Sequence, residues 1–528
     1  MRKWRVMLIL VAAQFIAVLD SSVMNVSLTT VAKDVGASIA TMQTIITMYA
    51  LVMAAFMITG GKIGDLVGRK RAFMFGLGIY ATGSGLTAVA QNSTMLFIGW
   101  SVIEGLGACL MVPAITALVA GNYRGKDRVT AYGLIAATAA LAVGIGPVLG
   151  GWVTATFSWR WVFVGEVIIS VFIIITGTVF LADARREGAR PKLDLVGTAL
   201  SASGLGVMVY GILASRSWGW VVPRGEVPIE PFGLSPVLFL IVAGLLVLAA
   251  FARWERRVAD RGGEPLVDLR LLGIGRLRGG LLTMSTQMSI LSGSFFILPV
   301  FLQVLLGFGP LKTGLSMVPA SLALLLVSFA GSRLAGRRSP RAIVRVGLVC
   351  LAGALGWMFA VVGPDATALT IAPALFLLGT GLGLNMPQLG TNNMGSVEPE
   401  RGGAVGGLQG SFQQVGSAMG TAVAGSILIL GLAVSAANLV EASPALSDQT
   451  KDAATSALAS GVQVVSTPQL EAALADTDLP TQEQQDLVEI NQSATVTGMR
   501  VALAGLFLIA VLAQIPARKL SGEPAAAP

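Results

Sequence analysis

Apolar stretches, each about as long as a membrane-spanning helix, follow one another along most of this 528-residue chain, and short basic or Gly- and Pro-rich breaks separate them. A helix needs about 20 mostly apolar residues to cross a bilayer, and it satisfies its own backbone hydrogen bonds in lipid. We therefore predict an all-α polytopic membrane protein with fourteen transmembrane helices. The predicted spans are 5–27, 42–60, 72–91, 95–120, 129–156, 161–182, 193–215, 233–253, 278–306, 312–335, 341–362, 368–390, 402–432 and 497–516.

The composition agrees with this pattern and excludes several classes of function. Hydrophobic residues make up 54% of the chain and charged residues only 12%, against roughly 25% in soluble domains. Cys109 and Cys350 fall inside apolar stretches, where we expect small buried side chains. The chain has no His and no phosphate-binding loop pattern, so we expect no metal, no cofactor, no ATP coupling and no enzymatic activity.

The basic residues indicate the orientation of the chain. Of the 36 Lys and Arg residues, 29 lie on the same side of the membrane as the N-terminus. They are near the two chain termini or in and beside the breaks on that side. Cytoplasmic loops of membrane proteins collect basic residues. We therefore expect both termini in the cytoplasm, with the chain in the inner (plasma) membrane of a bacterium. This topology also accounts for the net charge of +8 without a nucleic-acid partner.

One long polar break, residues 433–496, lies on the opposite side. It holds nine acidic residues and only one basic residue, Lys451. The spacing of its apolar residues allows one or two amphipathic surface helices. Two roles remain open for this segment, a cap over an outer vestibule or a plain solvated connector.

Three acidic residues lie well inside the predicted spans, away from the span ends, and all of them are in the first six: Asp20, Glu104 and Glu166. A charge inside a membrane helix is costly and marks a functional candidate. Asp20 lies late in the first span, where a carboxylate in a cavity of low dielectric could exchange protons near neutral pH, as proton coupling requires. Alternatively, Asp20 is a helix-end carboxylate solvated at the outer interface, and Glu104 and Glu166 only support the structure.

The break after the second span reads GKIGDLVGRKR over residues 61–71. Its glycines permit a tight reversal and a close approach of helices, and its acid can pair with neighbouring charges or a helix N-terminus. This stretch resembles the signature loop of the major facilitator superfamily. We call this stretch the gating loop, after the role that the resemblance implies. The residues matched to it are Gly61, Gly64, Asp65, Gly68, Arg69, Lys70 and Arg71.

Two further stretches resemble one branch of that superfamily, the 14-helix drug:proton antiporters. Residues 144–151 read GIGPVLGG, which is similar to the antiporter motif, in which the fifth helix packs against a helix of the second half. Residues 158–163 read SWRWVF, as at the start of the sixth helix of these antiporters. The residues matched to the antiporter motif are Gly144, Gly146, Pro147, Gly150 and Gly151.

The resemblance implies a major facilitator fold of two six-helix bundles with two inserted helices. The domains would be 1–190, the N-terminal bundle; 191–277, the inserted pair with a cytoplasmic linker; and 278–520, the C-terminal bundle with the loop 433–496. Residues 331–338 faintly echo the gating loop at a corresponding place in the second half, as expected of related bundles.

The departures from the family pattern concern its charges. The family's R-x-x-Q-G in the fourth helix reads Ser101-Val-Ile-Glu104-Gly105, so the arginine is missing and a carboxylate is present. The usual asparagine after the SWRW element is Glu166, and the usual tryptophan of the second helix is Thr44. If the three acids lie close together, at least one must be protonated at rest. Their excess favours a cationic substrate.

Amides are the polar groups that the second half offers. Some lie on one helical face, three, four or seven residues apart, and they could either bind substrate in a cavity or join helices to each other. The candidate cavity residues are Asn25 from the first span and Gln287, Gln303, Asn385, Gln388, Asn392, Gln409 and Gln413 from the second half.

The sequence thus predicts a monomeric, proton-coupled exporter with alternating access, which exchanges protons for a small, amphiphilic and cationic drug or toxic compound across the bilayer. A proton symporter, a uniporter, or an exporter of one metabolite or lipid remain alternatives. A membrane enzyme or a channel is disfavoured, because no nucleophile or metal cluster is recognisable and a channel would leave the gating loop unexplained.

Overall fold

The computed structural model describes residues 2–123, 125–181, 194–221, 223, 227–263, 265–334, 338–397, 402–460, 465–475, 477 and 479–523. The regular elements of this part are helices, with no strand among them. Ten of the helices are long and apolar enough to cross a membrane. An all-helical polytopic membrane protein is therefore confirmed, whereas the count of fourteen spans stays a prediction.

The first half of the chain forms one group of packed helices. In this group α1 packs against α6 and α7, while α3 packs against α5 and α7. The helices are α1 (Arg2–Asp34), α2 (Ile39–Val67), α3 (Arg69–Ala88), α4 (Ser93–Leu96), the π-helix η1 (Phe97–Glu104), α5 (Gly105–Asn122), α6 (Gly125–Thr156) and α7 (Arg160–Phe180).

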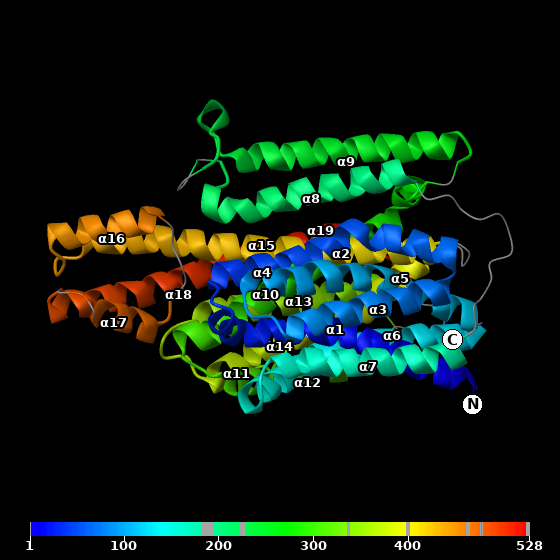
Figure 1. The fold of residues 1–528 in the computed structure, drawn as a ribbon, viewed down its shortest axis with the longest axis horizontal. Coiled ribbons are helices and arrows are strands. Elements are labelled where there is room, and N and C mark those ends of the chain that lie inside the picture. Colours follow the sequence, from blue (N-terminus) through cyan, green and yellow to red (C-terminus); the bar gives the residue numbers. More distant parts are fainter. Residues whose placement is uncertain are drawn as a thin grey trace.

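Two helices in the middle of the chain stand beside this group (Figure 1). They are α8 (Leu195–Trp218) and α9 (Pro236–Asp260), with the short 3-10 helix η2 (Pro231–Gly233) between them. A second short 3-10 helix, η3 (Leu269–Gly273), follows α9 and precedes the second half. Helix α8 packs against α9 on one side and against α2 and α15 on the other, so α9 reaches the bundle mainly through α8.

The second half forms a second group of helices. Here α10 packs against α14 and α15, α13 against α14 and α18, and α12 against α14. The elements are α10 (Gly275–Val300), the π-helix η4 (Phe301–Leu305), α11 (Pro310–Ser316), α12 (Val318–Leu334), α13 (Pro340–Val361), α14 (Ala368–Met394), α15 (Gly402–Ala442), α16 (Asp448–Ser460), α17 (Thr467–Ala475), α18 (Thr481–Leu512) and α19 (Gln514–Ala517).

The prediction that residues 61–71 form a loop is wrong. Helix α2 continues to Val67, and α3 begins at Arg69, so only Gly68 separates them. Gly68 has φ +102°, a conformation that favours glycine, and its N–H donates to the Gly64 carbonyl. The chain therefore reverses at a single residue, and the motif belongs to two helix ends.

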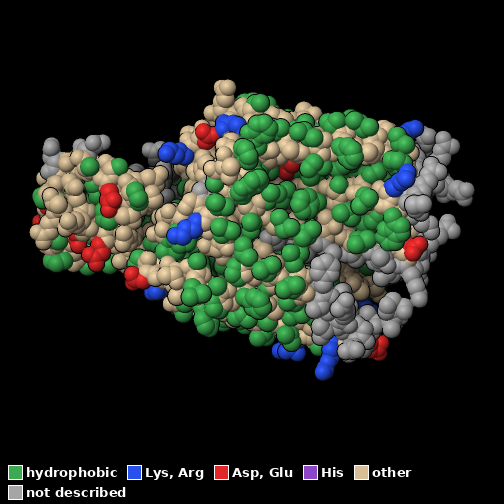
Figure 2. Space-filling model, turned by 90° about the horizontal axis from the view of Figure 1, so that it is seen from below, with side chains coloured by type: hydrophobic (Ala, Val, Ile, Leu, Met, Phe, Trp, Pro, Cys, Tyr) green, Lys and Arg blue, Asp and Glu red, His purple; other side chains and the backbone are tan. Residues whose placement is uncertain are grey.

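The acidic segment 433–496 is largely helical and has its own apolar contacts. Helices α15 and α18 extend beyond the rest of the bundle together with α16 and α17, at the end opposite both termini (Figure 1). Figure 2 shows the change of surface, from a hydrophobic body to a projection with few hydrophobic and several acidic side chains. Two small clusters hold the projection together; their buried members are Leu432, Ala436 and Ala494 in one and Val440, Leu446 and Ile490 in the other.

Side-chain hydrogen bonds reinforce this projection. Ser443 donates to Asp486 over 2.5 Å, and Thr450 donates to Glu483. The amphipathic helices that the sequence allowed are therefore present in the described part of this segment. Its role, as a cap or as a connector, stays a prediction.

Glycines allow α3 and α5 to pack with their backbones in contact. A methyl group on Gly107 would overlap the backbone of Tyr80, and one on Gly76 would overlap Leu110 and the backbone of α5. Because small residues let membrane helices approach closely, this contact fixes the position of the π-helix that precedes α5.

We predict that Gly107→Ala destabilises the protein by about 1–3 kcal/mol, the usual cost of overpacking a tight core. The matched control is Gly78→Ala in α3, because a methyl group there meets no atom within 4 Å. Thermal unfolding of both variants in detergent tests this expectation. Equal melting temperatures for Gly107→Ala and Gly78→Ala would contradict the close packing of α3 against α5.

Candidate functional site

The structure brings the three membrane acids together inside the N-terminal group of helices. Asp20 comes from α1, Glu104 from the end of η1 and Glu166 from α7, and all three are buried. One carboxylate oxygen of each lies within 4.8 Å of those of the other two. Residues 146 positions apart in sequence thus form one acidic cluster, which we call the carboxylate triad.

Asp20 lies in the middle of its helix, because α1 runs from Arg2 to Asp34. The predicted position late in the first helix is therefore wrong, and its side chain has no exposed surface. The alternative of a helix-end carboxylate solvated by the outer interface is contradicted as well.

The π-helix η1 supplies the nearest partner of Asp20. Trp100 Nε1 donates to both carboxylate oxygens of Asp20, at 2.7 and 2.8 Å. The indole ring stacks on Tyr49 of α2, with centroids 4.9 Å apart and planes 5° apart. Short π-helical segments are rare and frequent at functional sites, and this one carries Trp100 and ends at Glu104.

Hydrogen bonds from α3 and η1 complete the surroundings of the triad. Ser84 Oγ donates to Glu166 Oε2 at 3.2 Å, and Ser101 Oγ donates to the Ile45 carbonyl of α2 at 2.7 Å. Ser101 stands where the family motif has arginine. The neutral hydroxyl therefore joins two helices and leaves the triad without the family's positive charge.

The triad lacks a charge partner among the residues that the structure describes. Both oxygens of Glu104 and Oε1 of Glu166 are buried without a hydrogen bond, and the ion pairs recorded elsewhere do not involve the triad. Carboxylates in such surroundings can share protons among themselves or surround a cation.

Trp100, Tyr49 and Ser84 were not predicted from the sequence. Trp100 had a usable signal, since it lies four residues before Glu104 inside a membrane span and its N–H needs a partner when buried. Tyr49 and Ser84 had none, because only the packing of α2 and α3 brings them to the triad.

The antiporter motif lies in α6 and faces two helices. Methyl groups on Gly146 or Gly150 would overlap Ser22 or Val23 of α1, so these glycines allow close packing within the first half. The Pro147 carbonyl instead lies against Gly314 of α11, in the second half. Gly144 and Gly151 belong to the same helix.

The gating residues tie the ends of α2 and α3 to other helices. Arg69 donates to the Ala117 carbonyl of α5 at 3.0 Å, and Lys70 donates to the Thr178 carbonyl of α7 at 2.9 Å. Arg71 is exposed and Gly61 is partly buried. The side chain of Asp65 lies outside the part that the structure describes, so its pairing stays a prediction.

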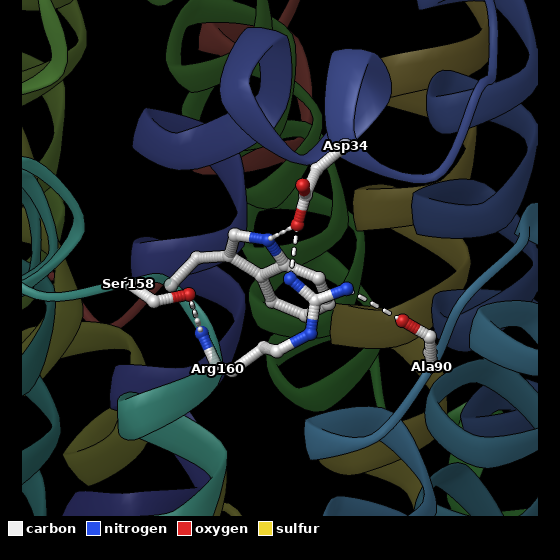
Figure 3. Close-up of polar contacts among 5 residues, drawn as sticks. Asp34, Ala90, Ser158 and Arg160 are labelled. Atoms are coloured by element: carbon white, nitrogen blue, oxygen red, sulfur yellow. Dashed lines mark hydrogen bonds and ion pairs between the residues drawn. The ribbon is translucent and has the colours of Figure 1, made fainter.

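The SWRW element joins three helix ends at the opposite end of the first half (Figure 3). Asp34, at the end of α1, accepts a hydrogen bond from Trp159 Nε1 at 2.9 Å and forms an ion pair with Arg160. Arg160 also donates to the Ala90 carbonyl at 2.7 Å, and its guanidinium lies 4.5 Å from the centre of the Trp159 ring. This cluster holds the start of α7 against the ends of α1 and α3.

The predicted cavity amides differ in their hydrogen bonding, and their place in a substrate cavity stays a prediction. Asn25 donates to the Ser21 carbonyl of its own helix at 2.6 Å, and Asn392 accepts from Arg276 at 3.1 Å. Gln287 and Asn385 are buried with both amide atoms unpaired. The remaining members are Gln388, which is buried, Gln409, whose Nε2 is buried without a partner, and Gln413, which is partly buried.

Comparison with known families identifies the fold. The family model described as Major Facilitator Superfamily matches residues 10–199 and again residues 193–421. The chain belongs to the major facilitator superfamily. Members of this superfamily are transporters, so a transporter rather than an enzyme is confirmed.

Relatives of this facilitator include antibiotic transport and resistance proteins. It is 31% identical over 433 residues to the probable actinorhodin transporter of Streptomyces coelicolor, covering 81% of this chain and 72% of that protein. It is also 31% identical to the puromycin resistance protein pur8 of Streptomyces alboniger, covering 81% and 82%. These relatives confirm the resemblance to drug-efflux facilitators.

A solved structure shares its fold. A bacterial homologue of the human lysosomal transporter Spinster, described as inward-facing and unoccupied, aligns with a TM-score of 0.59 over 99% of both chains, at 14% identity. At this identity the likeness shows the fold alone.

The two halves of this facilitator meet through hydrogen bonds and glycine contacts. Gln303 of η4 donates to the Val26 carbonyl of α1 at 2.7 Å and accepts a hydrogen bond from Thr29. Gln43 of α2 donates to the Thr421 carbonyl of α15 at 3.0 Å. Gln303 therefore joins helices, which is the alternative to substrate binding that the sequence left open.

We predict that Gly314→Val separates α6 from α11, because the added side chain would overlap the Pro147 carbonyl. The separation should reach about 1–2 Å or more, the scale of helix shifts between packed states. Spin labels at Phe157 and Leu315, which are both exposed, would report it as a longer mean distance after replacement of the two native cysteines.

Gly309→Val is the matched control for this experiment, since a Cβ atom added there meets nothing within 4 Å. The same distance distribution in Gly314→Val and Gly309→Val would refute the predicted role of the Pro147 contact.

Proposed function

We propose that this chain is a proton-coupled exporter of amphiphilic, cationic drugs or antibiotics. The observation that carries this proposal is the carboxylate triad, three acids within 4.8 Å and fully buried in a helical bundle. Relatives named as export proteins support the direction of transport, and the triad supports the coupling.

The electrostatic free energy of burying three ionised carboxylates is so unfavourable that the triad must hold protons. Each isolated ionised carboxylate in a protein interior costs several kcal/mol, and like charges at this distance repel each other further. The surrounding donors are few: Trp100 for Asp20 and Ser84 for Glu166. A closed triad is therefore neutral or nearly neutral, and loss of a proton requires either water or a cation nearby.

This requirement can couple protons to substrate. When water reaches the triad, a proton can leave, and the resulting negative charge disfavours closure until a proton returns or a cationic substrate binds nearby. Tyr49 and Trp100 connect Asp20 to α2, which packs along α15 of the second half. The charge of the triad would in this way bias the contact between the two halves.

A dedicated exporter of one metabolite is the second candidate. It is favoured by relatives such as the cephamycin export protein CmcT of Amycolatopsis lactamdurans, which is 31% identical over 78% of this chain and 82% of that protein. The excess of acids favours a cation as substrate in either case.

The proposal includes a topology. Residues 1–190 and 278–520 would form two six-helix bundles, and 191–277 would carry the inserted pair. With fourteen spans and both termini in the cytoplasm, the acidic projection of 433–496 would face outward as a cap. We propose that the protein is a monomer in the bacterial plasma membrane. Its orientation follows from the positive charges at the end that holds both termini, because cytoplasmic loops collect basic residues.

We predict that Asp20→Asn abolishes proton coupling. The amide keeps the size of the side chain and can still accept the Trp100 hydrogen bond, but it cannot release a proton. In proteoliposomes with an imposed pH gradient, uptake of a fluorescent cationic dye and the internal pH are followed together. The gradient-driven rate should fall by about tenfold or more, the effect of roughly 1.4 kcal/mol.

Glu255→Gln is the matched control, because Glu255 is also a buried acid but lies in α9, away from the triad. It should retain coupled transport. If Asp20→Asn transports dye against the gradient as fast as Glu255→Gln does, Asp20 is not the coupling acid. Dye flux in the unaltered protein that ignores the pH gradient would instead indicate facilitated diffusion.

A further inference from the structure

The carboxylate triad has a fourth oxygen beside it that the proton mechanism does not use. The Tyr49 side chain is buried, and its hydroxyl lies close to Asp20 and Glu104 without a well-formed hydrogen bond. Its ring is held by the stack on Trp100, so the hydroxyl is positioned by the same residue that binds Asp20. The site thus offers three carboxylates and one neutral oxygen.

The dimensions of the triad suit a hard cation. Three oxygens at most 4.8 Å apart have a common point within about 2.8 Å of each, and hard cations bind oxygen at roughly 2.3–2.6 Å. A contraction of a few tenths of an ångström would close the shell. The set contains no sulfur or nitrogen ligand, which disfavours transition metals.

The charge of the buried site selects a monovalent ion. Exchange of one proton for one alkali cation leaves the net charge of the triad unchanged, so the bundle can close around either occupant. A divalent cation would require the loss of a second proton for the same balance. Glu104, whose two oxygens have no hydrogen-bond donor, is the member with most to gain from a cation.

We propose that the carboxylate triad with the Tyr49 hydroxyl binds Na⁺ in competition with protons, so that either ion can serve as the coupling ion. The role in transport rests on the proposed function, whereas binding can be measured without it. The cation is a transported ion that binds reversibly, not a resident metal cofactor.

Binding of ²²Na⁺ to the purified protein at pH 8 tests this inference, with choline chloride holding the ionic strength constant. We expect saturable binding of one ion per chain, with an apparent Kd that rises up to tenfold when the pH falls by one unit. Glu104→Gln and Tyr49→Phe probe the site, and Glu255→Gln is again the control. Glu104→Gln should raise the Kd at least tenfold, Tyr49→Phe should raise it less, and Glu255→Gln should leave it unchanged.

Tryptophan fluorescence would place the ion at the triad. Na⁺ should change the emission of the unaltered protein with the same midpoint as ²²Na⁺ binding, and the change should be absent in Trp100→Phe. Saturable binding that Glu104→Gln and Glu166→Gln both leave intact would overturn the assignment, as would stronger competition by Ca²⁺ than by Li⁺.

The two proposals fail separately. Absence of ²²Na⁺ binding, together with pH-driven dye transport, would refute the cation site and leave the proton-coupled exporter standing. Saturable binding lost in Glu104→Gln, together with no dye transport, would support the cation site and refute the proposed drug efflux.

Discussion

A carboxylate withdrawn from water costs several kcal/mol unless a proton or a cation neutralises it, and this bundle buries three of them within 4.8 Å. The architecture around them follows from that constraint. The π-helix η1 presents Trp100 to Asp20 and ends at Glu104. Gly83 and Gly107 let α3 approach η1 and α5 closely. A methyl group on Gly83 would overlap the backbone of η1, and one on Gly107 would overlap the backbone of α3. This packing closes the site from lipid and water. The triad is thus held together by packing, in spite of its electrostatic repulsion.

The same helices carry the contact between the two halves. Helix α1 holds Asp20 and, six residues later, the Val26 carbonyl that binds Gln303 of the second half. Helix α2 carries Tyr49 beside the triad and Gln43 in contact with α15. A change in the charge of the triad therefore acts on helices that also join the halves. In the proposed mechanism, these helices form a short physical link between ion occupancy and the relative position of the two halves.

The sequence predicted the helical membrane fold, its family and the three acids, because apolar length and intramembrane charge are local signals. The closeness of Asp20, Glu104 and Glu166 could not be read from it, since it depends on how three distant helices pack. The sequence indicated a loop where the chain in fact reverses at Gly68 alone. Composition cannot distinguish a reversal at one glycine with positive φ from a longer Gly-rich loop. The amides illustrate the same limit: Gln303 joins two helices, and nothing in its spacing distinguishes that role from substrate binding.

If the triad holds exchangeable protons inside the membrane, infrared difference spectroscopy should detect them directly. Buried carboxylic acids absorb in a carbonyl region separate from that of carboxylates. We predict a band from protonated acids at neutral pH that disappears when Asp20→Asn, Glu104→Gln and Glu166→Gln are combined, in a protein that remains folded. The band should fade as the pH is raised. An identical spectrum for the unaltered protein and the triple variant would show that the triad carries no protons, and the account of coupling would be wrong.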